Sequence, residues 1–152
     1  MRTTKSERLT ALILRVFQLN GLMLAWGDAF LAPAGLTSAR WQMLGALALG
    51  DGPASAPKIA EAMGVTRQGA QKQIHLLVQD GLIEAQPNPA HKRSPRYVLT
   101  EAGRRVYARV EQQWQAHAEA AAAAFSAADL DTASQVLDAI AAQHARHDEA
   151  HA

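Results

Sequence analysis

The stretch GVTRQGAQKQIHLLVQDGLI begins at Gly64 and concentrates long polar side chains in its first half: Arg67, Gln68, Gln71 and Lys72. Their spacing places them on one face of the first two turns of a predicted helix. Arginine pairs with guanine through two hydrogen bonds and glutamine pairs with adenine, and each good pair discriminates by about 1–3 kcal/mol. The pattern therefore indicates a helix that reads DNA bases. The alternative is an ordinary solvated helix face, where the same residue types are common.

The residues around this polar face predict where its helix begins and which side of the helix is buried. Thr66 is expected to cap the helix, and its apolar side is predicted to be Ala70, Ile74, Leu77 and Val78. A short helix precedes it, capped by Ser55 and ended by Gly64, with Ile59, Ala60 and Met63 pointing inward. Two short helices joined this tightly match a helix-turn-helix. The predicted DNA-facing residues of the second helix are Thr66, Arg67, Gln68, Gln71, Lys72 and His75.

A basic hairpin is predicted after Gly81. The segments LIEAQ (82–86) and RYVLT (96–100) have the alternating character of strands, and the connecting PNPAHKRSP is rich in turn formers. We expect the hairpin tip to carry His91, Lys92, Arg93 and Arg96. Three cations within five residues, with no acid, favour contact with phosphates or a narrow minor groove. The alternative is a loop charged only for solubility.

Helices are predicted on both sides of these elements. Residues 6–31 indicate one helix about 39 Å long, which cannot bury its apolar side against a small domain alone and is expected to pack against a second chain. Pro33 and Gly35 end it, and Thr37 or Ser38 caps the next helix. Thr100 is expected to start another long helix. A capping box from Ser126 to Asp129 is expected to start the last helix. The predicted fold is mainly α with a small β-hairpin.

Charge is distributed unevenly along the 152 residues. Residues 55–110 carry nine Lys/Arg against four Asp/Glu, whereas residues 111–152 carry one against seven. A basic middle third indicates an anionic partner. The absence of cysteine excludes disulfides and thiol-based redox sensing in this chain. We find no signal peptide and expect no membrane span, so the chain is predicted to be cytoplasmic.

Enzyme signatures are missing. The sequence has no phosphate-cradling glycine loop and no nucleophile elbow, so we predict neither an enzyme nor a cofactor. His144, His147 and His151 share one side of the last predicted helix, a spacing that can bind zinc. No carboxylate or thiolate completes a cage there, so we predict no metal site. A metal-responsive regulator stays open as an alternative.

Three segments together resemble the MarR family of winged-helix regulators: GLTSARWQMLGAL, KIAEAMGVTRQGAQKQIHLLVQDGLIE and NPAHKRSPRYVLTEAGR. They cover residues 35–105, and LTEAGR after a basic hairpin is the most specific part. The resemblance implies a winged helix-turn-helix domain at 35–105, between dimerisation helices at 1–34 and 106–152. It further implies a homodimer that binds a pseudo-palindromic DNA operator with half-sites roughly 34 Å apart.

The resemblance also assigns roles to residues. Arg67, Gln68, Gln71 and Lys72 fall at base-facing and phosphate-facing positions of the family, and Arg93 falls on its wing arginine. One departure concerns the wing, where His91 replaces the Asp that usually pairs with an arginine and Pro95 stiffens the tip. The wing geometry is therefore left open by the sequence.

Many family members release DNA when a small aromatic anion binds between the dimerisation helices and the winged domain. Trp26, Phe30 and Trp41 are the candidates for lining such a pocket, with core packing as the alternative for each. Our hypothesis is a sequence-specific repressor that such a ligand releases from DNA. The alternative is a winged-helix protein-interaction module, or anti-regulator, that does not itself bind DNA. The operator, the regulated genes, the effector and the sign of regulation are not encoded in any recognisable motif.

Overall fold

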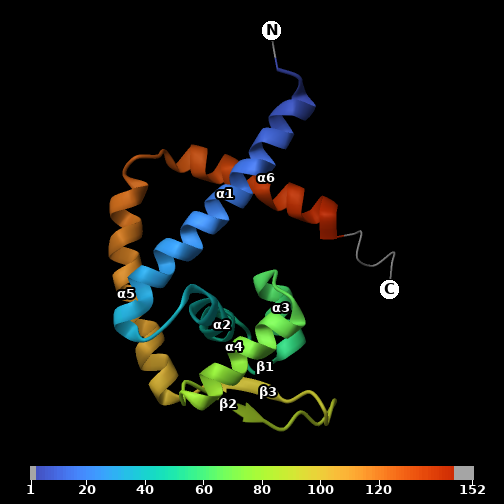
Figure 1. The fold of residues 1–152 in the computed structure, drawn as a ribbon, viewed down its shortest axis with the longest axis vertical. Coiled ribbons are helices and arrows are strands. Elements are labelled where there is room, and N and C mark those ends of the chain that lie inside the picture. Colours follow the sequence, from blue (N-terminus) through green and yellow to red (C-terminus); the bar gives the residue numbers. More distant parts are fainter. Residues whose placement is uncertain (1–2, 146–152) are drawn as a thin grey trace. The chain divides into compact units, whose positions relative to one another are not determined.

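The computed structural model describes residues 3–145 (Figure 1). The chain divides into two units, one ending at Glu111 and one beginning at Gln112, and helix α5 continues across this boundary. The fold is mainly helical with one small sheet, as predicted. In chain order the elements are α1 (Lys5–Leu31), a short 3₁₀ helix (Ala32–Ala34), α2 (Ser38–Leu49), β1 (Ala54–Ser55), α3 (Ala56–Met63), α4 (Arg67–Gln79), β2 (Ile83–Gln86), β3 (Arg96–Leu99), α5 (Glu101–Ala122) and α6 (Ala127–Ala145).

The 27-residue helix α1 begins at a capping box. The Thr4 side chain accepts a hydrogen bond from the Glu7 amide at 3.2 Å, and the Thr4 amide donates to the Glu7 carboxylate at 2.6 Å. Only Gly27 and Leu31 of this helix are buried. We expected no segment able to cross a membrane, but the helical segment Lys5–Ala34 is long and apolar enough by length and composition. The exposed apolar side chains of this helix also fit an interface with a second protein chain.

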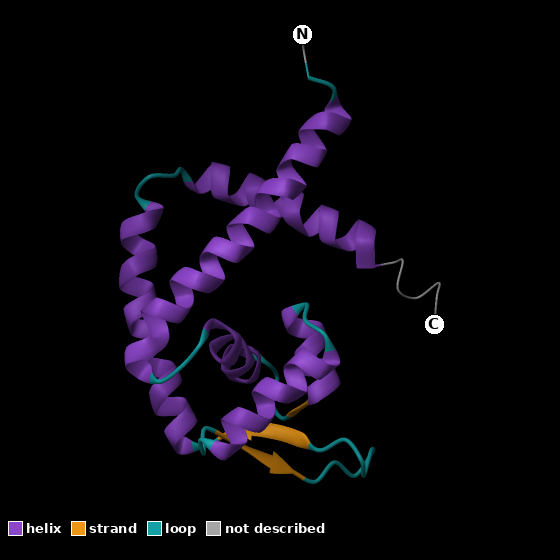
Figure 2. Ribbon diagram, in the orientation of Figure 1, coloured by secondary structure: helices purple, strands orange, loops and turns teal. Residues whose placement is uncertain are grey.

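The sheet has three antiparallel strands in the order β1-β3-β2 (Figure 2). The hairpin of β2 and β3 is confirmed, with Ile83 opposite Leu99 and Gln86 opposite Arg96. The short strand β1 was not predicted, because two residues are too few to show alternation. Ser55 pairs with Arg96 in this strand and is also the N-cap residue of α3, as expected, but its side chain makes no capping hydrogen bond.

The core of the first unit lies among α2, α3, α4 and the sheet. Its fully buried side chains include Met43, Leu44, Ile59, Ile74, Leu77 and Ile83. On α4, the predicted core residues Ala70, Ile74 and Leu77 are buried, whereas Val78 is 38% exposed. The prediction for Val78 was wrong because each step along a helix turns the side chain by about 100°. Leu49, at the end of α2, is 81% exposed.

Two adjacent residues at the start of α2 have different roles: one caps the helix and the other binds α1. Thr37 caps the helix by accepting a hydrogen bond from the Arg40 amide at 3.3 Å. Ser38 instead binds α1, because its amide donates to Asp28 Oδ1 at 2.7 Å and its hydroxyl donates to the Leu24 carbonyl at 2.9 Å. A side chain at Gly27 would overlap the Ser38 hydroxyl. This glycine therefore allows α1 and α2 to join closely.

The second unit contains the end of α5 and helix α6. Ser126 caps α6 by accepting from the Asp129 amide at 3.1 Å, which is one of the two hydrogen bonds of the predicted capping box. All residues of α6 except Ile140 are exposed, including the apolar Leu130, Val136 and Leu137. Such a helix lacks the packing that stabilises most helices in folded proteins.

Candidate nucleic-acid interface

The turn between α3 and α4 fixes where the polar helix begins. Gly64 follows α3 with φ of 64°, a left-handed conformation that glycine adopts at little cost. Thr66 then caps α4 by accepting a hydrogen bond from the Gly69 amide at 3.0 Å. The turn and the cap together fix the residue at which α4 begins.

The predicted DNA face of α4 lies on the surface of the protein. All six residues are exposed: Thr66, Arg67, Gln68, Gln71, Lys72 and His75. In the described part of the chain, neither Arg67 nor Lys72 forms an ion pair. Their charges are therefore not neutralised by an internal carboxylate, which leaves both cations available to an external anion.

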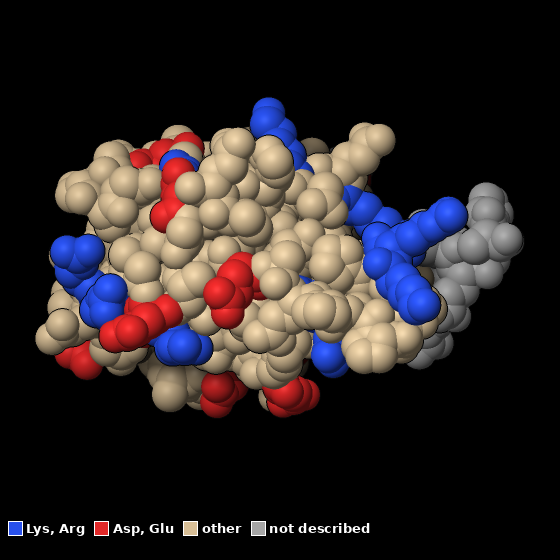
Figure 3. Space-filling view, turned by 90° about the horizontal axis from the view of Figure 1, so that it is seen from below, with Lys and Arg blue, Asp and Glu red and all other residues tan. Residues whose placement is uncertain are grey.

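The wing loop brings a second group of cations to the surface. His91, Lys92 and Arg93 are exposed in the loop between β2 and β3, and Lys and Arg side chains gather over the wing end in Figure 3. Arg96 does not belong to the tip, contrary to our expectation, because it is the first residue of β3. It is half-buried, and its Nε atom has no hydrogen-bond partner among the residues from 3 to 145.

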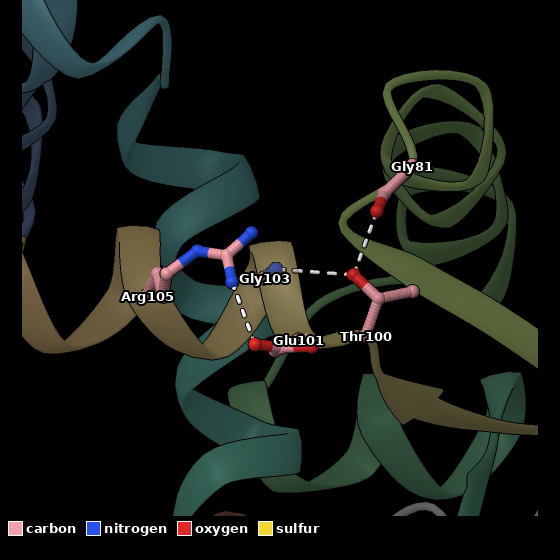
Figure 4. Close-up of polar contacts among 5 residues, drawn as sticks. All are labelled: Gly81, Thr100, Glu101, Gly103 and Arg105. Atoms are coloured by element: carbon pink, nitrogen blue, oxygen red, sulfur yellow. Dashed lines mark hydrogen bonds and ion pairs between the residues drawn. The ribbon is translucent and has the colours of Figure 1, made fainter.

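The LTEAGR segment locks the wing to α5 (Figure 4). The Thr100 hydroxyl donates to the Gly81 carbonyl at 2.6 Å and accepts from the Gly103 amide at 3.0 Å. The Thr100 amide donates to the Leu82 carbonyl at 3.1 Å. Glu101 also pairs with Arg105 at 2.8 Å on the exposed side of α5. One threonine therefore joins the end of the hairpin, the start of α5 and the residues that follow α4.

The sequence is similar to those of known proteins. The sequence profile of the MarR family matches residues 34–94. An uncharacterized protein of Mycobacterium tuberculosis is 44% identical over 101 residues, which make up 66% of this chain and 69% of that protein. The chain belongs to the MarR family.

Solved structures of MarR-family proteins have the same fold. The regulator AbsC from Streptomyces coelicolor superposes with a TM-score of 0.78 at 21% identity, covering 97% of this chain and 99% of AbsC. A mutant MarR from E. coli complexed with operator DNA superposes with a TM-score of 0.74 at 18% identity, covering 91% and 99% of the two chains. The winged helix-turn-helix fold predicted from the sequence is thus confirmed.

An ion pair that the sequence analysis missed joins α2 to α4. Arg40 Nη1 of α2 lies 2.8 Å from Asp80 Oδ2, at the C-terminal end of α4, and the Arg40 side chain is only 19% exposed. No sequence signal connects two residues forty positions apart. The Asp80 side chain is 50% exposed, so the pair links α2 to α4 but contributes only modestly to stability, as solvent-exposed pairs do.

The three aromatic residues proposed for a ligand pocket lie at the α1–α2 side of the winged domain. Trp26 and Phe30 stack with ring centroids 4.9 Å apart, and Phe30 and Trp41 pack against the buried core. A cavity of about 520 Å³ is formed by residues of α1, α4 and the start of α2. None of the three lines that cavity; its lining residues are Leu24, Asp28, Thr37, Ser38, Ala39, Arg40, Lys72, Gln73 and Leu76.

The C-terminal histidines give no metal site within the described residues. His144 Nδ1 lies 2.7 Å from the Ile140 carbonyl oxygen of its own helix. Residues 3–145 contain no group of three metal-ligating side chains. His147 and His151 lie outside the described residues, so the alternative of a metal-responsive regulator is untested.

Proposed function

We propose that this MarR-family protein is a cytoplasmic homodimeric repressor that binds a pseudo-palindromic operator in double-stranded DNA. The observation that carries the proposal is the exposure of two cation groups, Arg67 and Lys72 on α4 and Lys92 and Arg93 on the wing, none of which forms an ion pair within residues 3–145. Phosphate neutralisation by such groups supplies much of DNA affinity. The glutamines beside Arg67 supply base-reading groups in the first turns of a recognition helix.

The proposal of a homodimer rests on the apolar surface of α1. Leu14, Phe17, Leu19 and Leu22 are each more than half exposed in the single chain. Soluble proteins rarely leave so large an apolar surface uncovered unless it binds a partner. A second copy of the chain would cover it and pair two recognition helices, as a palindromic operator requires.

A DNA-binding assay on the region upstream of the gene tests the proposed function. We expect two chains to bind per operator, and the affinity to fall about 10³-fold between 50 and 200 mM salt if at least six phosphates are contacted. A random duplex of equal length serves as the control and should bind more weakly. Equal affinity for both duplexes would contradict sequence-specific binding. No binding to either would favour the protein-interaction alternative.

Replacement of Phe17, which is 70% exposed, tests the dimer. We expect Phe17→Glu to shift the protein toward monomer, because a dimer would have to bury two unpaired carboxylates. Sedimentation at micromolar concentration measures the shift, and DNA affinity should fall with it. Gln18→Glu is the matched control, since it adds the same charge at a neighbouring polar position. A wild-type protein that sediments as a monomer would contradict the proposal.

We further propose that a small aromatic anion releases the protein from DNA. The cavity of about 520 Å³ supports this proposal, because it combines apolar Leu24 and Leu76 with the cations Arg40 and Lys72. This volume suits a small ligand. Lys72 also lies on the proposed DNA face, so a ligand that attracts its charge competes with DNA.

Salicylate is a suitable probe of this release. Millimolar sodium salicylate is expected to lower operator affinity by about tenfold, a coupling of roughly 1.4 kcal/mol between the two sites. The affinity is measured by fluorescence anisotropy, with sodium chloride at equal ionic strength as the control. An identical response to both salts would show that screening alone weakens binding.

A further inference from the structure

The wing loop is held closed by an asparagine. Asn88 Nδ2 donates a hydrogen bond to the Ser94 carbonyl at 2.9 Å, across the loop from the end of β2 to the start of β3. Two backbone bonds divide the enclosed segment into turns: the His91 amide donates to the Asn88 carbonyl at 3.1 Å, and the Ser94 amide donates to the His91 carbonyl at 3.0 Å. Asn88 therefore binds both the middle and the far end of the loop.

The closed segment contains the exposed cations of the wing. Lys92 and Arg93 lie between Asn88 and Ser94, and residues 87–95 include no carboxylate. Adjacent positive charges repel one another and favour an open loop. The Asn88 side chain is half-buried, which shields its bond from competing water. The bond opposes this repulsion before any DNA arrives.

The chemistry of the bond requires an amide. Ser94 offers a backbone carbonyl, which only accepts hydrogen bonds, so the partner must donate. Aspartate has the size of asparagine but turns a second acceptor toward that carbonyl. The departure at His91 left the wing geometry open in the sequence; in the structure, the cross-loop brace comes from Asn88 three residues earlier.

We propose that Asn88 is a positioning residue for DNA binding, whose bond to Ser94 presets the wing so that Lys92 and Arg93 contact phosphates. This inference rests on the proposed DNA binding. A preset loop loses less conformational freedom on binding, so its cations contribute more affinity.

The test compares salt dependence among wing variants on the upstream duplex. We expect Asn88→Ala and Asn88→Asp to weaken binding about fivefold or more at 150 mM salt and to lower the slope of log affinity against log salt by about one, the equivalent of one phosphate contact. Partial unfolding would lower the amount of active protein without changing this slope. Circular dichroism checks that each variant is folded. Ser94→Ala is the matched control, since the acceptor is a backbone carbonyl that alanine keeps.

A combined variant separates positioning from other effects. In a Lys92→Ala/Arg93→Ala background, Asn88→Ala should change the slope no further, because the side chains it positions are gone. An unchanged slope for Asn88→Ala in an otherwise wild-type wing would overturn the inference, as would an equal loss for Ser94→Ala. Absence of DNA binding by the wild-type protein would instead overturn the proposed function, so the two failures are distinguishable.

Discussion

Arg67→Ala is expected to lower operator affinity by about 1–3 kcal/mol per half-site, a factor of roughly 5 to 150, while weakening random-duplex binding much less. Arg67 is the first residue of α4, directly after the Thr66 cap, and its exposed guanidinium forms no ion pair with any residue the structure describes. Its planar group offers two parallel donors to a guanine edge, and alanine offers none.

Arg67→Lys separates charge from base reading. Lysine keeps the positive charge but lacks the planar fork, so random-duplex affinity and the salt slope should stay close to wild type while operator preference falls. Competition binding with operator and random duplex at one salt concentration measures the ratio. Equal losses on the two duplexes for Arg67→Ala would show that Arg67 contacts phosphate and does not read a base.

The sequence predicted those parts of the fold that local patterns encode. The Thr66 cap, the turn at Gly64 and the β2–β3 hairpin are all specified by residues close in the chain, and the structure confirms each of them. Features built from distant residues were missed. The two-residue strand β1 exists only because β3 pairs with it, and the bond between Arg40 and Asp80 depends on how α2 packs against α4.

The candidate DNA site also has one part that the sequence predicted and one part that it did not. The α4 face could be read from helical spacing alone, because exposure follows from the buried positions Ala70, Ile74 and Leu77. The wing contacts could not be predicted in this way, because the residues of a loop do not alternate between buried and exposed positions at a regular spacing. Arg96 was placed at the tip but lies in β3, and the brace from Asn88 to Ser94 is a side-chain contact that no spacing rule predicts.

Gly103→Ala is expected to destabilise the protein by about 3 kcal/mol, at the upper end of the usual cost of overpacking. A methyl group at this position would overlap the Leu82 carbonyl oxygen and lie 2.9 Å from the Leu82 carbonyl carbon. Backbone atoms cannot rotate away as a side chain can. The same carbonyl accepts the Thr100 amide, so moving it also weakens the junction of the hairpin with α5.

The midpoint of thermal unfolding measures this effect at one fixed protein concentration, because a dimer's midpoint depends on concentration. For a chain of this size, 3 kcal/mol corresponds to a fall of about 6–12 °C. Gly45→Ala is the matched control, since a methyl group there would meet only the Tyr107 ring at 3.8 Å, an ordinary contact, and alanine favours helix by up to about 1 kcal/mol. We therefore expect Gly45→Ala to keep or raise the midpoint. If Gly103→Ala did the same, the close approach of α5 to Leu82 would not be what makes glycine necessary in LTEAGR.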